Sequence, residues 1–147
     1  MISRSKDYLF SIIRQHYFGV NSYNRYAIVV VFEELYPEVS ENIKNKVCPF
    51  CGRRFAKKLS LYMHLWGRKN SYNKKNNSCK IKFRNVLEHV LEVYYDIVKI
   101  ARYENGRSGK KGRLYKLRDL KGIVHYFPDL REFSAFYIKT YVKVRVI

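Results

Sequence analysis

Cys48-Pro49-Phe50-Cys51 opens the most informative stretch of this sequence, and His64 follows Cys51 after twelve intervening residues. Two cysteines separated by two residues form a knuckle whose thiolates point at one ion, and a histidine delivered by a following helix adds a third ligand. Phe55 and Leu61 lie between them, where a small metal-stabilised unit needs two apolar side chains. The spacing predicts a zinc site. The alternative is a redox pair or two ordinary thiols.

The offsets of Cys48, Cys51, Phe55, Leu61 and His64 resemble those of the C2H2 zinc finger. The resemblance implies a small unit in which a cysteine knuckle precedes a helix that carries the histidine. It breaks at the fourth ligand, because residues 68–70, where the second histidine would fall, are Arg, Lys and Asn. It also departs at position 46, where the family usually has an aromatic residue and this chain has lysine.

Cys79 is the natural substitute for the missing histidine. It follows a stretch rich in Asn, Lys and Ser, residues 67–78, which we expect to be a loop that leads the chain back to the metal. The alternative is that Cys79 is a free buried thiol and a histidine or water completes the site. The prediction is one structural zinc ion held by Cys48, Cys51, His64 and Cys79.

The charge of the chain points to a polyanionic partner. Thirty Lys and Arg against 12 Asp and Glu leave a formal net charge of +18, more than solubility requires. From Lys44 to Arg84 there are thirteen Lys and Arg and no acidic residue. A basic run is often only a solvated face, but this one is centred on the finger pattern and favours phosphate binding. An anionic membrane is disfavoured, since there is no run of about 18 apolar residues and no continuous basic amphipathic helix.

The resemblance to a finger also implies which helix positions face bases. They are Lys57, Leu59, Ser60 and Met63, and only the lysine and the serine can hydrogen-bond to a base. Selectivity must then come from a second copy in a dimer, or from flanking helices and the basic loop near residues 105–112. The expected nucleic-acid contacts are Arg53, Arg54, Lys57, Lys58, Ser60, Arg68, Lys69, Lys74, Lys75, Arg107, Lys110 and Lys111.

Apolar periodicity predicts an α+β protein that is predominantly α, with the finger embedded in a small helical domain and a short C-terminal β element. Helices are expected over 6–18, 27–36, 40–46 and 85–101, and another from about 128. A strand is expected over 141–146. Residues 113–118 suit either a strand that could pair with it or the start of a helix. The expected segments are 1–46 (N-terminal helical), 47–82 (finger) and 83–147 (C-terminal helical domain with a terminal strand).

These features predict a nucleic-acid-binding protein, in the first place a transcriptional regulator that binds duplex DNA, and not an enzyme. Glu88, His89, Glu92 and Asp96 lie at helical spacing and are interpreted as surface pairs rather than catalytic groups. RNA binding is an alternative, because 16% of the residues are aromatic. A nuclease or recombinase targeted by the finger is another.

The expected location is intracellular. The N-terminus does not have the pattern of a signal peptide, and three cysteines assigned to one metal site leave none for a disulfide framework. The composition and the single finger resemble the small regulators encoded by viruses and plasmids of thermophilic archaea.

Overall fold

The computed structural model of the chain describes residues 6–19, 26–67, 77–105 and 115–142. These residues form six helices and one two-stranded antiparallel sheet, which confirms the predominantly α, α+β prediction. In chain order the elements are α1 (Lys6–Phe18), α2 (Ala27–Leu35), α3 (Pro37–Lys44), α4 (Lys58–Leu65), α5 (Asn77–Asn105), β1 (Tyr115–Arg118), β2 (Val124–Phe127) and α6 (Leu130–Tyr141). None of these helices combines the length and the apolar character needed to cross a bilayer.

Helix α2 forms the centre of the core because it is apolar on nearly every side. Its residues 28–32 are all buried, and a helix that is hydrophobic all round must be covered on all sides. Helices α1, α3, α5 and α6 pack against it. The prediction of a helix here, for a run that also suits a strand, is confirmed. The next helix was expected from Ser40 but begins at Pro37, since proline fits the first turn of a helix.

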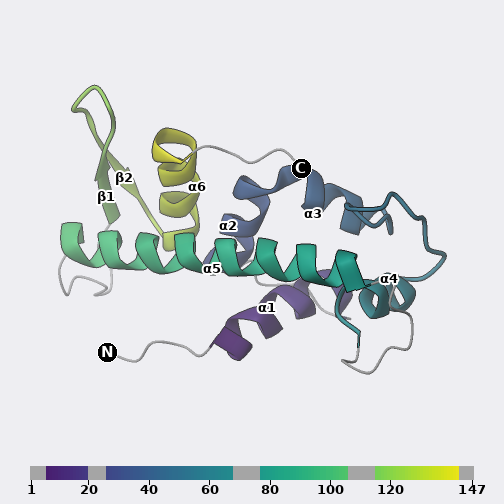
Figure 1. Cartoon of the computed structure of the whole chain (residues 1–147). Coiled ribbons are helices and arrows are strands. Elements are labelled where there is room, and N and C mark those ends of the chain that lie inside the picture. Colours follow the sequence, from purple (N-terminus) through teal and green to yellow (C-terminus); the bar gives the residue numbers. More distant parts are fainter. Residues whose placement is uncertain (1–5, 20–25, 68–76, 106–114, 143–147) are drawn as a thin grey trace.

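Helix α5 is the longest element, with 29 residues, and it runs the length of the molecule (Figure 1). Its predicted start at Asn85 is wrong, because the helix begins at Asn77. Cys79, Phe83 and Val86 are buried and continue the apolar stripe of α5 at helical spacing. Their burial outweighs the local cap signal at Asn85. The helix therefore places Cys79 in its first turn and continues through residues 82 and 83.

The β element among the described residues is a hairpin of two neighbouring strands. Strand β1 pairs antiparallel with β2, with Tyr115 opposite Phe127. The strand predicted over residues 141–146 is wrong at its start, because Tyr141 is the last residue of α6 and Val142 is its C-cap. Residues 143–146 lie outside the described ranges. The predicted C-terminal helix is confirmed as α6, which buries Phe133, Ser134 and Ile138.

Candidate metal centre

The cysteine knuckle is the tip of a tight hairpin formed by residues 46–55. Val47 and Arg54 form an isolated antiparallel bridge. The Cys48 N–H donates to the carbonyl oxygen of Arg53 at 2.9 Å. These contacts fix the position of Cys48, which is buried, relative to the next strand-like segment.

The turn that carries the two cysteines ends at a residue with positive φ, directly after Cys51. Gly52 has φ of +76°, in the region that favours glycine, and its N–H donates to the carbonyl oxygen of Cys48 at 2.9 Å. The Phe50 N–H points at Sγ of Cys48, 3.5 Å away. A backbone N–H directed at a sulfur stabilises a thiolate there, as a metal ligand requires.

Helix α4 supplies the histidine from its buried side. Leu61, His64 and Leu65 are buried, and the His64 ring lies 5.1 Å from the ring of Phe55. The small core predicted from the sequence thus exists: Leu61 is fully buried, and the partly buried Phe55 packs against the main core. The Nδ1 atom of His64 is buried and has no hydrogen-bond partner among the described residues.

The four predicted ligands come together. The ligand atoms of Cys48, Cys51, His64 and Cys79 all lie within 4.8 Å of one another. A tetrahedral ion with bonds of about 2.0–2.3 Å holds its ligand atoms roughly 3.7 Å apart, and Sγ of Cys51 lies 3.6 Å from Nε2 of His64. The cluster could therefore hold one metal ion. Three of the four residues are buried, and Cys51 is exposed.

The protonation of the four groups follows from burial and from nearby charges. Burial raises the pKa of Cys48 to about 12 and also raises the pKa of Cys79. Burial opposes ionisation of Cys51 as well, but hydrogen bonds from the Arg53 backbone and from the other two thiols lower its pKa. Burial lowers the pKa of His64, so its imidazole is neutral, the form that ligates a metal. An ion that enters this site displaces thiol protons.

An aromatic cluster joins the metal centre to the main core. The Phe83 ring of α5 lies 5.0 Å from the Trp66 ring, 6.4 Å from the Phe50 ring and 6.3 Å from the Phe32 ring. Trp66 is the C-cap of α4, Phe50 belongs to the knuckle, and Phe32 belongs to α2. The metal centre is therefore packed against the helical core rather than attached by a linker.

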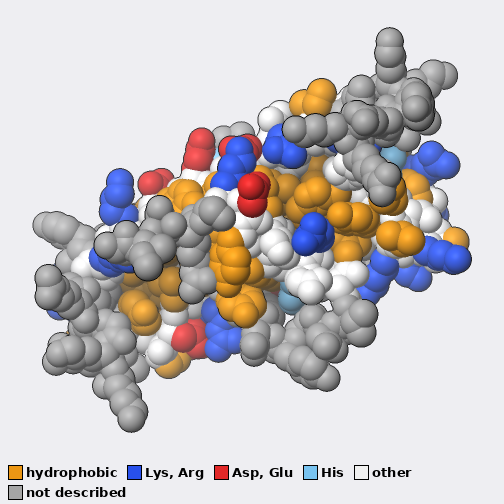
Figure 2. Space-filling view, turned by 90° about the horizontal axis from the view of Figure 1, so that it is seen from below, with side chains coloured by type: hydrophobic (Ala, Val, Ile, Leu, Met, Phe, Trp, Pro, Cys, Tyr) orange, Lys and Arg blue, Asp and Glu red, His pale blue; other side chains and the backbone are white. Residues whose placement is uncertain are grey.

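Exposed cations surround the centre. Arg53, Arg54, Lys57 and Lys58 are exposed, and none of them forms an ion pair with a carboxylate within the part of the chain that the structure describes. On the face shown in Figure 2, the end of the molecule that carries α4 shows Lys and Arg side chains without Asp or Glu among the coloured residues. Ser60 is also exposed on α4.

Several predicted contacts lie outside the described ranges: Arg68, Lys69, Lys74, Lys75, Arg107, Lys110 and Lys111. The structure adds one cation that is not among the predicted contacts. Lys80, one residue after Cys79, is close enough to His64 to contribute to its lowered pKa. Its place inside the acid-free range 44–84 is the signal that could have identified it.

Comparison with protein-family models found no match, and comparisons with curated proteins and with solved structures found none either. The four clustered side chains and the charges around them are therefore the basis for assigning a function.

Proposed function

We propose that the chain is a nucleic-acid-binding protein, in the first place a duplex-DNA-binding transcriptional regulator rather than an enzyme, whose binding surface is built on a structural zinc site. The observation that carries this proposal is the coincidence of two features. A cluster of three cysteines and one histidine lies within 4.8 Å, and exposed cations that make no ion pairs within the described residues surround it.

Zinc is the ion that suits this donor set. Three thiolates and one imidazole form a closed tetrahedral site, the arrangement of structural zinc, and leave no position for a catalytic water. The soft thiolate ligands do not suit magnesium or calcium, because these hard cations bind oxygen ligands. In this chain the ion would hold the knuckle, α4 and the first turn of α5 together.

Phosphate is the partner that suits the surrounding surface. An exposed cation with no carboxylate partner is available to a phosphate without first breaking an ion pair. Arg53 and Arg54 lie beside the knuckle, and Lys57 and Lys58 lie at the start of α4. Each such contact releases condensed counterions from duplex DNA, which makes affinity fall steeply with salt.

The exposed face of α4 supports weak selectivity. Leu59 and Met63 are exposed there, and neither can hydrogen-bond to a base edge. Lys57 and Ser60 remain as the only base-reading candidates of the finger. A single finger covers about three base pairs, so a regulator built on it gains a longer site from a second copy of the chain or from a second contact within it.

The test is a fluorescence-polarisation titration of the zinc-loaded chain with labelled duplex DNA at several salt concentrations. Arg54→Ala/Lys58→Ala should weaken binding to all sequences and flatten the log–log salt slope by about 2 × 0.9. The matched control is Lys6→Ala/Lys139→Ala, which also removes two charges. Lys6 pairs with Glu88, and Nζ of Lys139 lies 3.8 Å from Glu34, so this control should leave the slope nearly unchanged.

Three results would overturn the proposal. A salt slope near zero would exclude phosphate neutralisation as the source of affinity. Tighter binding to single-stranded RNA than to duplex DNA at equal salt would show that the surface binds RNA instead. Cleavage of plasmid DNA in Mg²⁺ would place the chain among DNA-processing enzymes.

A further inference from the structure

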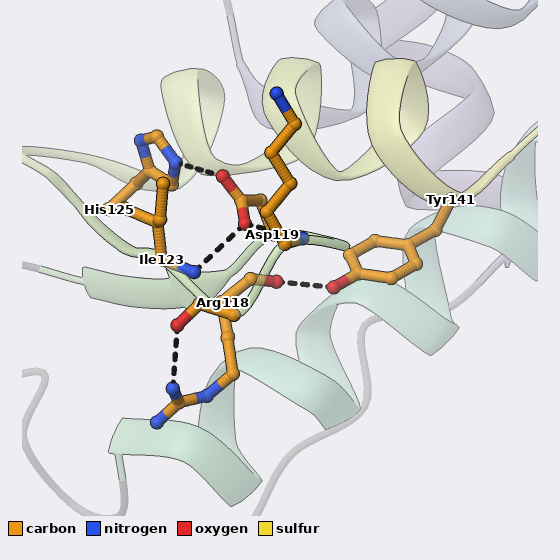
Figure 3. Close-up of polar contacts among 7 residues, drawn as sticks. Arg118, Asp119, Ile123, His125 and Tyr141 are labelled. Atoms are coloured by element: carbon orange, nitrogen blue, oxygen red, sulfur yellow. Dashed lines mark hydrogen bonds and ion pairs between the residues drawn. The ribbon is translucent and has the colours of Figure 1, made fainter.

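One carboxylate, that of Asp119, makes three contacts within the hairpin of β1 and β2 (Figure 3). Oδ1 of Asp119 accepts hydrogen bonds from the backbone N–H groups of Lys121 and Ile123, each at 2.9 Å. Its Oδ2 lies 2.7 Å from Nε2 of His125. The contact with His125 is the main cause of the lowered pKa of Asp119, so the carboxylate is ionised and fully engaged at neutral pH.

Further contacts brace the same turn. Nη1 of Arg118 donates to the carbonyl oxygen of Gly122 at 2.8 Å, and the Asp119 N–H donates to the carbonyl oxygen of Ile123 at 2.8 Å. The hydroxyl of Tyr141 donates to the carbonyl oxygen of Arg118 and ties the hairpin to α6 (Figure 3). A segment fixed in this way loses little conformational entropy when it binds a partner.

The braced turn displays apolar side chains to solvent. Leu120 is 75% exposed, more than any other large apolar residue in the described ranges, and Ile123 and Tyr126 are 55% and 62% exposed. Their side chains are not needed for the turn itself, which is held by Asp119 and the backbone. Exposed apolar side chains gathered on one short segment are a mark of an interaction site.

The charge of the hairpin is positive. Lys116, Arg118 and Lys121 are exposed, and Asp119 is the only acidic residue from Tyr115 to Phe127. Because that carboxylate is already engaged within the turn, the surface of the hairpin presents apolar groups and positive charge without an unengaged carboxylate.

The hairpin and the metal centre lie at opposite ends of α5. Figure 1 shows α4 beside the N-terminal end of α5 and the hairpin beside its C-terminal end, and both α4 and β1 pack against this helix. The 29 residues of α5, at about 1.5 Å each, span about 43 Å. Duplex DNA advances about 3.4 Å per base pair, so this length corresponds to about 13 base pairs, a little more than one helical turn.

We propose that the β1–β2 hairpin is a second duplex contact, about one helical turn from the finger, in which Leu120 and Ile123 enter a groove and Lys121 lies beside a phosphate. The proposal rests on duplex binding by the finger. Apolar side chains that enter a groove contact sugars and base edges and can act as wedges between base steps.

Other partners fit the hairpin less well. A stable protein interface covers about 800 Å² on each partner, which is more than three side chains on a two-stranded ribbon offer. Membrane attachment needs a larger apolar face than this one. A groove of duplex DNA admits a narrow element with a few apolar side chains and nearby cations. The turn between β1 and β2 has these features.

The experiment measures affinity against duplex length. The zinc-loaded full chain and its variant Leu120→Ala/Ile123→Ala are titrated with labelled duplexes of about 8 to about 24 base pairs, lengths chosen to lie on either side of one helical turn plus a finger site. A longer duplex offers more overlapping binding sites, which raises the apparent affinity of both proteins by the same factor. The ratio of the dissociation constant of the variant to that of the wild type removes this factor. The control variant is Tyr8→Ala/Tyr26→Ala, which removes two exposed large side chains from α1 and from the start of α2.

We expect a ratio near one on the shortest duplex, which admits only one contact. It should rise to roughly tenfold once both contacts fit, an effect of the size expected for burying an apolar side chain. The control should show no such rise, and circular dichroism should confirm that both variants are folded.

The outcomes separate the two proposals. A ratio near one at every length, with wild-type affinity that depends steeply on salt, would overturn the hairpin contact and leave the proposed function intact. A ratio that is raised equally at all lengths would also overturn it. Wild-type protein that binds no duplex would overturn both proposals. Loss of binding to anionic vesicles, with full duplex affinity kept, would make the hairpin a membrane contact instead.

Discussion

Replacing Cys79 by serine should weaken zinc binding by about two orders of magnitude. Cys79 is buried in the first turn of α5 and contributes one of the four clustered ligand atoms. Structural zinc sites bind with about 10–16 kcal/mol, so an equal share for one of four ligands is about 3 kcal/mol. This corresponds to a change of about a hundredfold in the dissociation constant.

The chain contains a natural reporter for this measurement. Trp66 is its single tryptophan, and the Trp66 ring lies 5.0 Å from the Phe83 ring of α5 and 6.1 Å from the Phe18 ring of α1. Its fluorescence should change when an ion draws α4 against α5. Titration with zinc buffered by a competing chelator then gives the dissociation constants of the wild-type protein and of Cys79→Ser.

A control variant separates loss of a ligand from loss of stability. His89→Ala removes the hydrogen bond between Nδ1 of His89 and the hydroxyl of Tyr36, at 2.8 Å, and leaves all four ligands in place. It should lower the melting temperature and leave the zinc dissociation constant unchanged. Equal zinc affinity for Cys79→Ser and the wild-type protein would refute the four-ligand site, as would an X-ray absorption spectrum that fits two sulfurs and two nitrogens.

Three further perturbations test individual features. Lys46 has φ of +61°, so Lys46→Gly should raise the free energy of unfolding in urea by about 1 kcal/mol, whereas Lys46→Ala, which keeps the strain, should not. The Glu132 N–H lowers the pKa of its acceptor Asp129, the N-cap of α6, and Asp129→Ala should cost about 1 kcal/mol at neutral pH. Because the pKa of Asp129 is depressed in the folded state, the stabilisation is complete at pH values above the pKa of the unfolded state, about 3.9. The difference in unfolding free energy between variant and wild type should shrink as the pH falls through the pKa of the folded state. A difference that does not depend on pH would contradict this. Chelation of zinc should remove the far-ultraviolet signal of the eight residues of α4 and leave most of the helical signal, and complete loss of that signal would show that the main core needs the ion.

Local spacing predicted the metal cluster because its chemistry is encoded in a short part of the chain. The knuckle, the offset of His64 and the absence of a second histidine sufficed to nominate Cys79, and the structure places all four ligand atoms together. The start of α5 could not be predicted in the same way. The sequence around Asn85 has a strong local cap signal, while Cys79 and Phe83 are buried only because the knuckle and α2 lie beside them.

The β hairpin was predicted only in part. β1 alternates between buried or half-buried and exposed residues and lies within residues 113–118, which suit a strand. β2 has no such alternation and buries none of its residues, so the partner of β1 could not be identified from the pattern. The turn is stabilised by the side chain of Asp119 and by contacts with Arg118 and Tyr141, and Tyr141 belongs to α6. Such contacts are set by tertiary packing and leave little trace in the local pattern.

The buried Nδ1 of His64, which has no hydrogen-bond partner within the described ranges, has a kinetic consequence. Most metal-ligating histidines anchor their second nitrogen with a hydrogen bond, which orients the ring. Among the described residues His64 has no such anchor, and its ring is positioned by burial and by the neighbouring Phe55 ring. An ion held here would lose its imidazole before any thiolate, because only the metal–nitrogen bond must break for the ring to turn away. A chelator would then attack at the position that His64 vacates while three sulfurs still hold the ion, so the rate of exchange should rise with chelator concentration.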